Sequence, residues 1–333
     1  PYLTQHKLVW ISEPISGAEI KAYLSINLLR YQSIIHTYKQ LSMLEFTENL
    51  LRNWFSNKWL CWGIGPVVAA NIGFFGSVLL LEGCLRTGLF DDCLITYSKT
   101  KTRHEAIKGT QLKISSMSQF QGCLWVLLGP SVLINAAAST YLLDFVHPMR
   151  ENDNVYPPLM EFIINVILLL VINDFFLYWG HRIQHMVEYL WKNCHSYHHQ
   201  IDTPTAVSTV YIDSLDATLQ AGLPVAIAGY IVAPHPLTMY AFVFLRLADN
   251  AINHSGINSI ILNALFLKYL PFRGSVGHHD AHHKFSNYTT NAKNFGEYFW
   301  LWDWLFGTLT SVSKLQELGR NHGKVDVNKS KAS

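Results

Sequence analysis

Long runs without charged side chains most limit how this chain can fold. Residues 60–81 and 120–143 contain no Asp, Glu, Lys or Arg, and residues 162–173 are apolar apart from their asparagines. A helix of 22 residues is about 33 Å long, enough to cross a bilayer's hydrocarbon core. A fourth run, 217–245, is interrupted by Pro234-His235-Pro236, so we expect a helical hairpin or a broken span there. The runs predict an all-α membrane protein with about four transmembrane or re-entrant segments.

The composition supports this class and argues against others. Charged residues make up 14 % of the chain, against about 25 % in a typical soluble domain, and aromatic residues make up 13 %. A net charge of +2 gives no electrostatic reason to expect a nucleic-acid partner. The five cysteines show no CxxC spacing, so we expect reduced thiols rather than a disulfide scaffold.

The loop charges predict an orientation. The segment between the first two runs is basic, and the segment 144–158 between the second and third is mostly acidic. Because basic loops stay in the cytosol, we place residues from about 180 onward on the cytosolic side. The chain ends in Lys329-Ser330-Lys331-Ala332-Ser333, which resembles a dilysine retrieval signal. We therefore expect a multi-pass protein of the endoplasmic reticulum membrane with a cytosolic C-terminus.

Histidines are concentrated and regularly spaced in the second half. Of the 16 histidines, 11 lie between residues 181 and 283. The pattern has five parts: His181-x3-His185, His195-x2-His198-His199, a single His254, His279-x2-His282-His283, and His278 directly before the last group. Residues three and four apart share one face of a helix, so each group directs two or three imidazoles to one point.

Such imidazoles predict a metal centre. Eight or nine ligands exceed the four that one tetrahedral zinc takes, and they suit two ions. Imidazole binds Fe, Zn, Cu and Ni, and oxidation of an unactivated C–H bond with O₂ favours iron. Ligating histidines usually donate their other N–H to a supporting group, for which we consider Asp174, His278, Asp280, Asp216, Asp249 and Asp303.

These motifs resemble the fatty acid hydroxylase/sterol desaturase superfamily of membrane di-iron enzymes. The resemblance covers roughly residues 60–308 and includes Asn253-His254-Ser255-Gly256, His278-His279-Asp280-Ala281-His282-His283, Asn294-Phe295-Gly296 and 302–308. The motifs are most similar to those of C4-methylsterol oxidases and cholesterol 25-hydroxylase. Two departures stand out: Asp213-Ser214-Leu215-Asp216 replaces the His-Pro-x-Glu common in sterol-oxidising relatives, and the segment 284–293 is longer.

The resemblance implies a ligand set, a cofactor and partners. The implied ligands are His181, His185, His195, His198, His199, His254, His279, His282 and His283, holding two iron ions, with no further catalytic residue. The implied reaction consumes O₂ and two electrons, inserts one oxygen atom and releases water. Cytochrome b5 and its reductase would supply the electrons, and a sterol or related isoprenoid lipid would be the substrate.

Other functions share these motifs. Within the superfamily they are fatty-acyl or sphingolipid hydroxylation, sterol desaturation and flavin-independent squalene epoxidation. Outside it they are a histidine-cluster zinc transporter or a structural di-zinc membrane protein. For the domains, we expect an amphipathic region at 1–59, transmembrane helices at 60–180, a histidine-box domain at 181–310 with a membrane hairpin at 217–245, and a polar cytosolic tail at 311–333.

Overall fold

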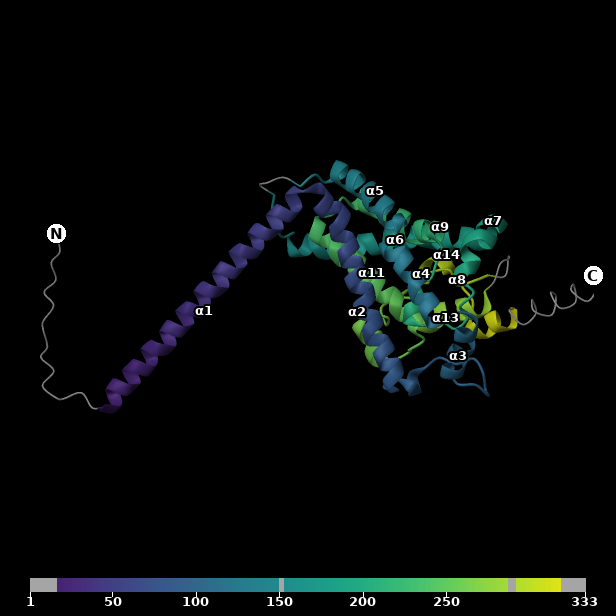
Figure 1. Ribbon diagram of the computed structural model, residues 1–333, viewed down its shortest axis with the longest axis horizontal. Helices are drawn as coiled ribbons and strands as arrows, with labels where there is room; N and C mark the ends of the chain where they lie inside the picture. The colour runs from purple at the N-terminus through teal and green to yellow at the C-terminus, as the bar shows by residue number, and fades with distance from the viewer. Residues whose placement is uncertain (1–16, 150–152, 287–291, 319–333) are drawn as a thin grey trace, which may run out of the picture. The chain divides into compact units, whose positions relative to one another are not determined.

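The structure is a computed structural model that describes residues 17–149, 153–286 and 292–318 (Figure 1). The chain divides into two units, Pro1–Asn53 and Trp54–Ser333. The described part of the first unit belongs to one long helix, α1 (Gly17–Ser56). Within the described ranges the second unit is helical, with two isolated β-bridges, Leu94–Ile257 and Arg273–Phe299. The predicted all-α membrane class is confirmed. The predicted tail signal at 329–333 lies outside the described residues.

Among the described residues, four stretches are long and apolar enough to cross a membrane. They are Trp59–Thr87 (η1, Trp59–Ile64, and α2, Gly65–Thr87), Ser116–Val146 (α4, Ser116–Leu128, and α5, Pro130–Val146), Leu159–Met186 (α6), and Ser214–Val232 (α9, Ser214–Ala217; η5, Thr218–Gly222; α10, Leu223–Val232). They contain the first three uncharged runs and the first half of the fourth. Large apolar side chains on their outer faces are exposed, among them Leu79, Leu133, Phe145 and Leu159.

Prolines interrupt two of the runs. The break expected in 217–245 is present: α10 ends at Val232, and α11 (Pro236–Ser255) begins after it. His235 caps the new helix, because its Nδ1 accepts a hydrogen bond from Leu237 N at 3.2 Å. The run 120–143 is also interrupted, which the sequence analysis did not predict. Gly129 is extended there, and Pro130 starts α5, where its missing N–H costs nothing.

Small residues bring the helices close together. α11 packs along α2, and α10 packs against α6. A Cβ atom on Gly73 of α2 would lie 2.5 Å from Phe244 O, and one on Gly65 would overlap the Tyr240 ring. Close approach without side chains is a common way to pack helices in membranes. The pair α2–α11 therefore fixes the position of the end of α11, where His254 lies.

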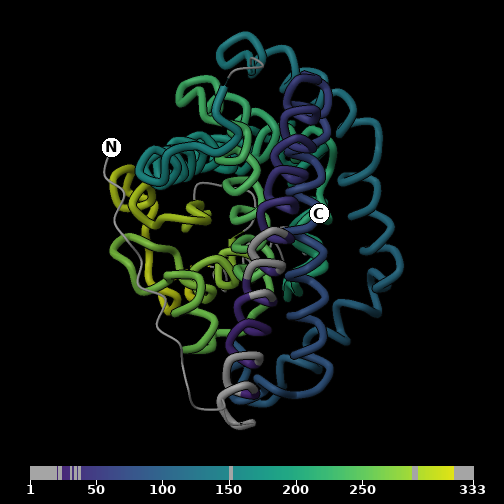
Figure 2. The backbone as a smooth tube through the Cα atoms, turned by 90° about the vertical axis from the view of Figure 1, so that its left-hand side faces the viewer, coloured from purple at the N-terminus to yellow at the C-terminus, as the bar shows by residue number. Residues whose placement is uncertain are grey.

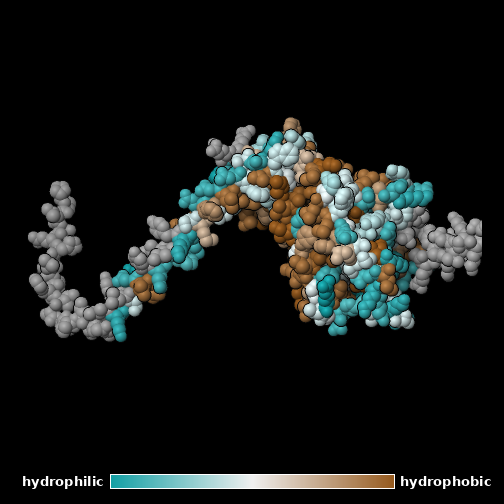
Figure 3. Space-filling model, in the orientation of Figure 1, coloured by the Kyte–Doolittle hydropathy of each residue, from teal (hydrophilic) through white to brown (hydrophobic). Residues whose placement is uncertain are grey.

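Shorter elements join the spans and cover one end of the body. They are η2 (Asp91–Cys93), α3 (Arg103–Lys113), α7 (Glu188–Leu190), η3 (Trp191–His195), α8 (Ser196–His198), η4 (Ala206–Val210), α12 (Ile260–Leu265), α13 (Val276–Phe285) and α14 (Leu301–Leu305). In Figure 2 the segments after residue 276 (yellow) lie on the side away from α4 and α5. In Figure 3 hydrophobic residues dominate the face over α2 and α5, whereas hydrophilic residues gather near α3 and α7.

Candidate metal centre

Four parts of the chain bring the nine predicted ligands into one buried space. They are His181 and His185 of α6, His195, His198 and His199 of the η3–α8 turn, His254 of α11, and His279, His282 and His283 of α13. None is more than 9 % exposed. His195 ends a π-helical turn, a local widening that is frequent at functional sites.

The side chains form two groups. His181, His185, His195, His199 and His282 form the first, and His198, His254 and His283 form the second. Within each group the possible ligand atoms all lie within 4.8 Å of one another. His279 lies outside both groups by this measure, but its Nε2 is 3.1 Å from Nε2 of His254. The groups adjoin, because the rings of His199 and His283 stack with centroids 4.9 Å apart.

Backbone carbonyl groups fix the orientation of four of the rings. The contacts from Nδ1 are His181 to Phe295 O (2.8 Å), His198 to Tyr211 O (3.2 Å), His254 to Asn250 O (2.9 Å) and His282 to Lys293 O (2.7 Å). A carbonyl oxygen only accepts, so Nδ1 carries the proton in each neutral ring. Nε2 then keeps its lone pair, and in this tautomer a histidine binds a metal through Nε2.

The unpartnered nitrogens indicate that the cluster is built for cations. Both ring nitrogens of His199, Nδ1 of His279 and His283, and Nε2 of His282 are buried with no hydrogen-bond partner among the described residues. Each such atom costs about 1–3 kcal/mol unless something binds it. Nine imidazoles form a donor set that suits Fe, Zn, Cu or Ni and does not suit Mg or Ca. The residues therefore fit two transition-metal ions.

Burial keeps these imidazoles neutral. Removal from water lowers the pKa of His198 to about 4 and the pKa of His254 and His282 to about 3. The pKa of His199, His279 and His283 also falls well below the usual range, first through burial and then through neighbouring histidines. At neutral pH the cluster therefore presents lone pairs rather than positive charges.

Asp216 supports one of the rings directly. Its Oδ2 accepts a hydrogen bond from His195 Nδ1 at 2.8 Å, and its Oδ1 accepts one from Gln220 Nε2 at 2.5 Å. Asp216 is fully buried. This carboxylate is the last residue of the stretch 213–216, in which the sequence departs from His-Pro-x-Glu. The segment therefore keeps an acidic partner for a histidine of the cluster.

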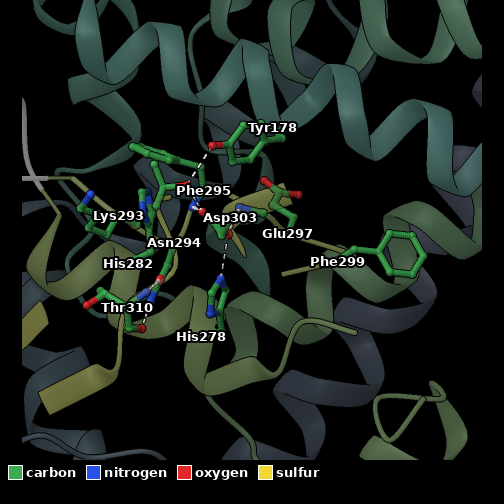
Figure 4. Close-up of polar contacts among 12 residues, drawn as sticks. Tyr178, His278, His282, Lys293, Asn294, Phe295, Glu297, Phe299, Asp303 and Thr310 are labelled. Atoms are coloured by element: carbon green, nitrogen blue, oxygen red, sulfur yellow. Dashed lines mark hydrogen bonds and ion pairs between the residues drawn. The ribbon is translucent and has the colours of Figure 1, made fainter. Parts of the chain in front are cut away.

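His278 and Asp303 act through the backbone. Asp303 accepts hydrogen bonds from Phe295 N and Gly296 N, both at 2.8 Å, and from His278 Nε2 at 3.2 Å (Figure 4). Burial opposes ionisation of Asp303, but hydrogen bonds from His278, Thr308 and the backbone lower its pKa. Because Phe295 O in turn accepts from His181, this carboxylate holds in place the segment that orients that ring.

Asp174 and Asp280 lie elsewhere. Asp174 accepts hydrogen bonds from Tyr298 N (3.0 Å) and Phe299 N (2.9 Å), and Asp280 forms a buried ion pair with Arg103 at 2.7 Å. Neither carboxylate has a hydrogen bond to a histidine among the described residues. Both connect the elements that carry the ligands: Asp174 ties α6 to residues 298–299, and Asp280 ties α13 to α3.

A second buried network was not predicted as such. Asp249 bonds to Lys268 Nζ (2.8 Å) and Arg273 Nη2 (2.9 Å), and Lys268 Nζ also donates to Asn253 Oδ1 (2.6 Å). Burial lowers the pKa of Lys268 to about 8, although Asp249 opposes the shift. The network fixes the side chain of Asn253, the residue directly before His254. The only sequence signal for this network is that Lys268 and Arg273 are isolated basic residues among apolar ones.

An apolar cavity of about 180 Å³ lies between α2, α4, α5, α10 and α11. Its lining includes Val210 and Ile212, which flank the carbonyl partner of His198, and Ala217, which follows the partner of His195. The residues that orient His198 and His195 therefore separate the cavity from these two rings, on the side of the apolar helices. Its apolar lining suits part of a lipid molecule.

The fold and this site define a membrane protein with a buried cluster of histidines that could hold metal ions. Residues 166–308 match the family model described as fatty acid hydroxylase. The predicted superfamily is thus confirmed for the segment that carries all nine histidines.

Several curated proteins are similar to the chain. Methylsterol monooxygenase 2-2 of Arabidopsis thaliana is 30 % identical over 165 residues, which cover 50 % of this chain and 59 % of that protein. Very-long-chain aldehyde decarbonylase GL1-11 of Oryza sativa subsp. indica is 30 % identical, over 48 % and 57 % of the two chains. Putative Delta(7)-sterol-C5(6)-desaturase 2 of Arabidopsis thaliana is 33 % identical, over 43 % and 47 %. The matches thus span about half the length of these relatives, and no solved structure matches the chain.

Proposed function

We propose that this chain is an iron-dependent membrane oxygenase that oxidises a sterol or a related isoprenoid lipid. The observation that carries the proposal is the pair of adjoining histidine groups beside an apolar cavity. The reaction would convert R–H, O₂, two electrons and two protons into R–OH and water. The relatives named as a methylsterol monooxygenase and a sterol desaturase support a sterol substrate.

In this proposal the nine histidines would hold two iron ions, which supply O₂ activation and C–H cleavage when bound. The chain's own residues orient the histidine rings and exclude water. Backbone carbonyls keep four Nδ1 protons in place, so the Nε2 lone pairs stay directed into the cluster. Asp216 and Asp303 fix His195 and the segment that orients His181. Burial of all these groups excludes water, which limits side reactions.

The cavity would place the lipid against the cluster from within the membrane. We propose the endoplasmic reticulum as the location, with the cluster on the cytosolic side. We also propose cytochrome b5 and its reductase as the electron donors. The orientation rests on the basic residues of the 99–113 segment, of which Lys99, Lys101, Lys108 and Lys113 are exposed.

A direct experiment uses the full chain purified in lipid nanodiscs from iron-replete cells. Metal content is measured by mass spectrometry, and ¹⁸O₂ incorporation is followed with NADH, cytochrome b5, its reductase and 4-methylsterol or cholesterol. We expect about two iron ions per chain and one labelled oxygen in the product. His198→Ala should abolish incorporation, whereas His104→Ala, which alters a half-buried histidine paired with Asp91, should not. Iron-loaded protein that leaves sterols unchanged would refute the proposed reaction.

The aldehyde decarbonylase relatives favour one alternative within the same chemistry. The same assay distinguishes it, because a long-chain aldehyde rather than a sterol would be consumed. A zinc transporter or a structural di-zinc protein would instead contain zinc and consume no O₂. His181 and His185 lie within the last six residues of the span Leu159–Met186, and the other ligands lie outside the four spans, whereas a transporter places ionisable ligands near the middle of the membrane.

A further inference from the structure

One charged side chain lines the apolar cavity. Arg246 of α11 is the single charged residue among the described residues that line it, and only 4 % of its surface is exposed. The other lining residues are apolar or uncharged, such as Val243 and Leu247 from the same helix. A charged group among apolar membrane helices is expensive, and it usually serves a binding or transport site.

The hydrogen bonds of Arg246 leave part of the guanidinium available. Nη2 donates to Gln220 O at 2.8 Å. Nε donates to Asn173 at 3.0 Å when the asparagine amide is oriented to satisfy both of its neighbours. Nη1 has no hydrogen-bond partner among the described residues. Because Arg246 lines the cavity, a guanidinium N–H group that has no protein partner is a donor available to a ligand there.

Arg246 is linked to His195 through two residues, Gln220 and Asp216. Its partner Gln220 bonds through Nε2 to Asp216, and Asp216 bonds to His195. Trp62 and Gly63, which also line the cavity, lie at the start of the first span, Trp59–Thr87. A group bound to Arg246 would therefore sit beside the metal centre, and the rest of the ligand would extend along apolar walls.

The charge around Arg246 favours a neutral ligand atom. Glu297 and Asp174 act electrostatically on the guanidinium and offset its positive charge. Burial raises the pKa of Glu297 to about 7, so this residue carries part of that negative charge at neutral pH. A carboxylate ligand would add a further negative charge to this site. A hydroxyl or carbonyl oxygen accepts the hydrogen bond without that repulsion.

We infer that Arg246 is a specificity-determining residue, which donates from Nη1 to a neutral oxygen of an otherwise apolar lipid. The inference rests on the proposed function and adds a prediction about its regiochemistry. Because the bound oxygen lies beside the centre, the carbon that is oxidised lies near that oxygen and not at the far apolar end of the molecule.

The test measures binding without turnover. Tritiated cholesterol is bound to the full chain in nanodiscs and displaced with cholesterol, with 5-cholestene, which lacks the oxygen, or with stearate. We expect wild-type protein to prefer cholesterol to 5-cholestene by about tenfold or more, the effect of one hydrogen bond to a charged donor. Arg246→Met should reduce this ratio to about one. Leu245→Met, on the same helix but outside the cavity lining, should keep it.

The outcomes separate this inference from the proposed function. Equal affinity of wild-type protein for cholesterol and 5-cholestene would overturn the inference, as would an unchanged ratio in Arg246→Met protein with a normal melting temperature. Tighter binding of stearate than of cholesterol would also overturn it. If Arg246→Met does not fold, Arg246→Lys, which keeps a donor, should show an intermediate ratio. A preserved ratio in protein without oxygenase activity would support the inference and contradict only the proposed reaction.

Discussion

Asp216→Asn tests the link between one buried carboxylate and the metal centre. In the native protein the two oxygens of Asp216 each accept one hydrogen bond, from His195 Nδ1 and from Gln220 Nε2. An asparagine offers one oxygen and one NH₂ group to the same two donors. One donor is therefore left unpaired as long as Gln220 keeps its native amide orientation. An unpaired buried donor costs about 1–3 kcal/mol, and the lost charge weakens the remaining bond.

This cost should appear as weaker metal binding, because a His195 ring whose Nδ1 has lost its hydrogen-bond partner is free to turn. We expect iron to leave the Asp216→Asn protein about 10- to 100-fold faster than wild type when a chelator is added. Iron remaining on the protein is measured by mass spectrometry over time. Asp213→Asn serves as the matched control, since Asp213 caps α9 by accepting from Leu215 N and asparagine caps equally well.

Equal rates of iron loss for Asp216→Asn and Asp213→Asn would refute this reasoning. Far-UV circular dichroism and melting curves show whether both variants are folded before the rates are compared. Asp216→Glu adds a second test. It keeps both acceptor oxygens but moves them by one methylene group, so its rate should lie between those of wild type and Asp216→Asn.

Three further predictions concern stability. The folded-state pKa values of His198, His254 and His282 lie below the unfolded value of about 6.5. Below about pH 6.5 the unfolded chain therefore binds more protons than the folded chain. Each imidazole then removes about 1.4 kcal/mol per pH unit, and the melting temperature of metal-free protein should drop steeply between pH 6 and 4; a flat profile would contradict the burial argument. Gly256→Ala adds a Cβ at a left-handed φ of 69° and against the Arg103 guanidinium, so it should disrupt the Arg103–Asp280 pair. We expect a loss of about 3–5 kcal/mol in the free energy of unfolding, measured by thermal unfolding. The loss should exceed that of Gly76→Ala, where the space around the added Cβ is open. Gly73→Val should separate α2 from α11 and lower the melting temperature, whereas an unchanged value would show that the contact with Phe244 adapts freely.

The sequence predicted the parts of the site that depend on local spacing. HxxxH and HxxHH place imidazoles on one helix face whatever the tertiary structure. His181 and His185 do fall in one group, whereas each HxxHH motif is divided between the two groups. Asp174 shows where local reasoning ends. It lies on the helix face of His181 seven residues earlier, yet its carboxylate contacts the backbone of Tyr298 and Phe299, more than 120 residues away. Only the three-dimensional packing decides between these two partners.

The same reason explains what the sequence missed in the membrane region. Gly129 and Pro130 divide a run that has no charge and looks continuous by hydropathy. Arg246 directly follows the fourth run, and by hydropathy its charge ends that run. In the structure it lies inside a cavity formed by five helices, and the contacts that place it there come from Asn173 and Gln220. Neither residue is near it in the sequence.

The carbonyl groups that hold the Nδ1 protons have a consequence for how such a centre evolves. The acceptors belong to Tyr211, Asn250, Lys293 and Phe295, but the contact uses only the main chain. Mutation can exchange the side chains at these four positions without removing a single acceptor. Ring orientation therefore does not require particular amino acids at these four positions. It requires instead that the loops keep their length and path. An insertion or deletion between His198 and Tyr211 should therefore harm the centre more than a substitution of Tyr211 itself.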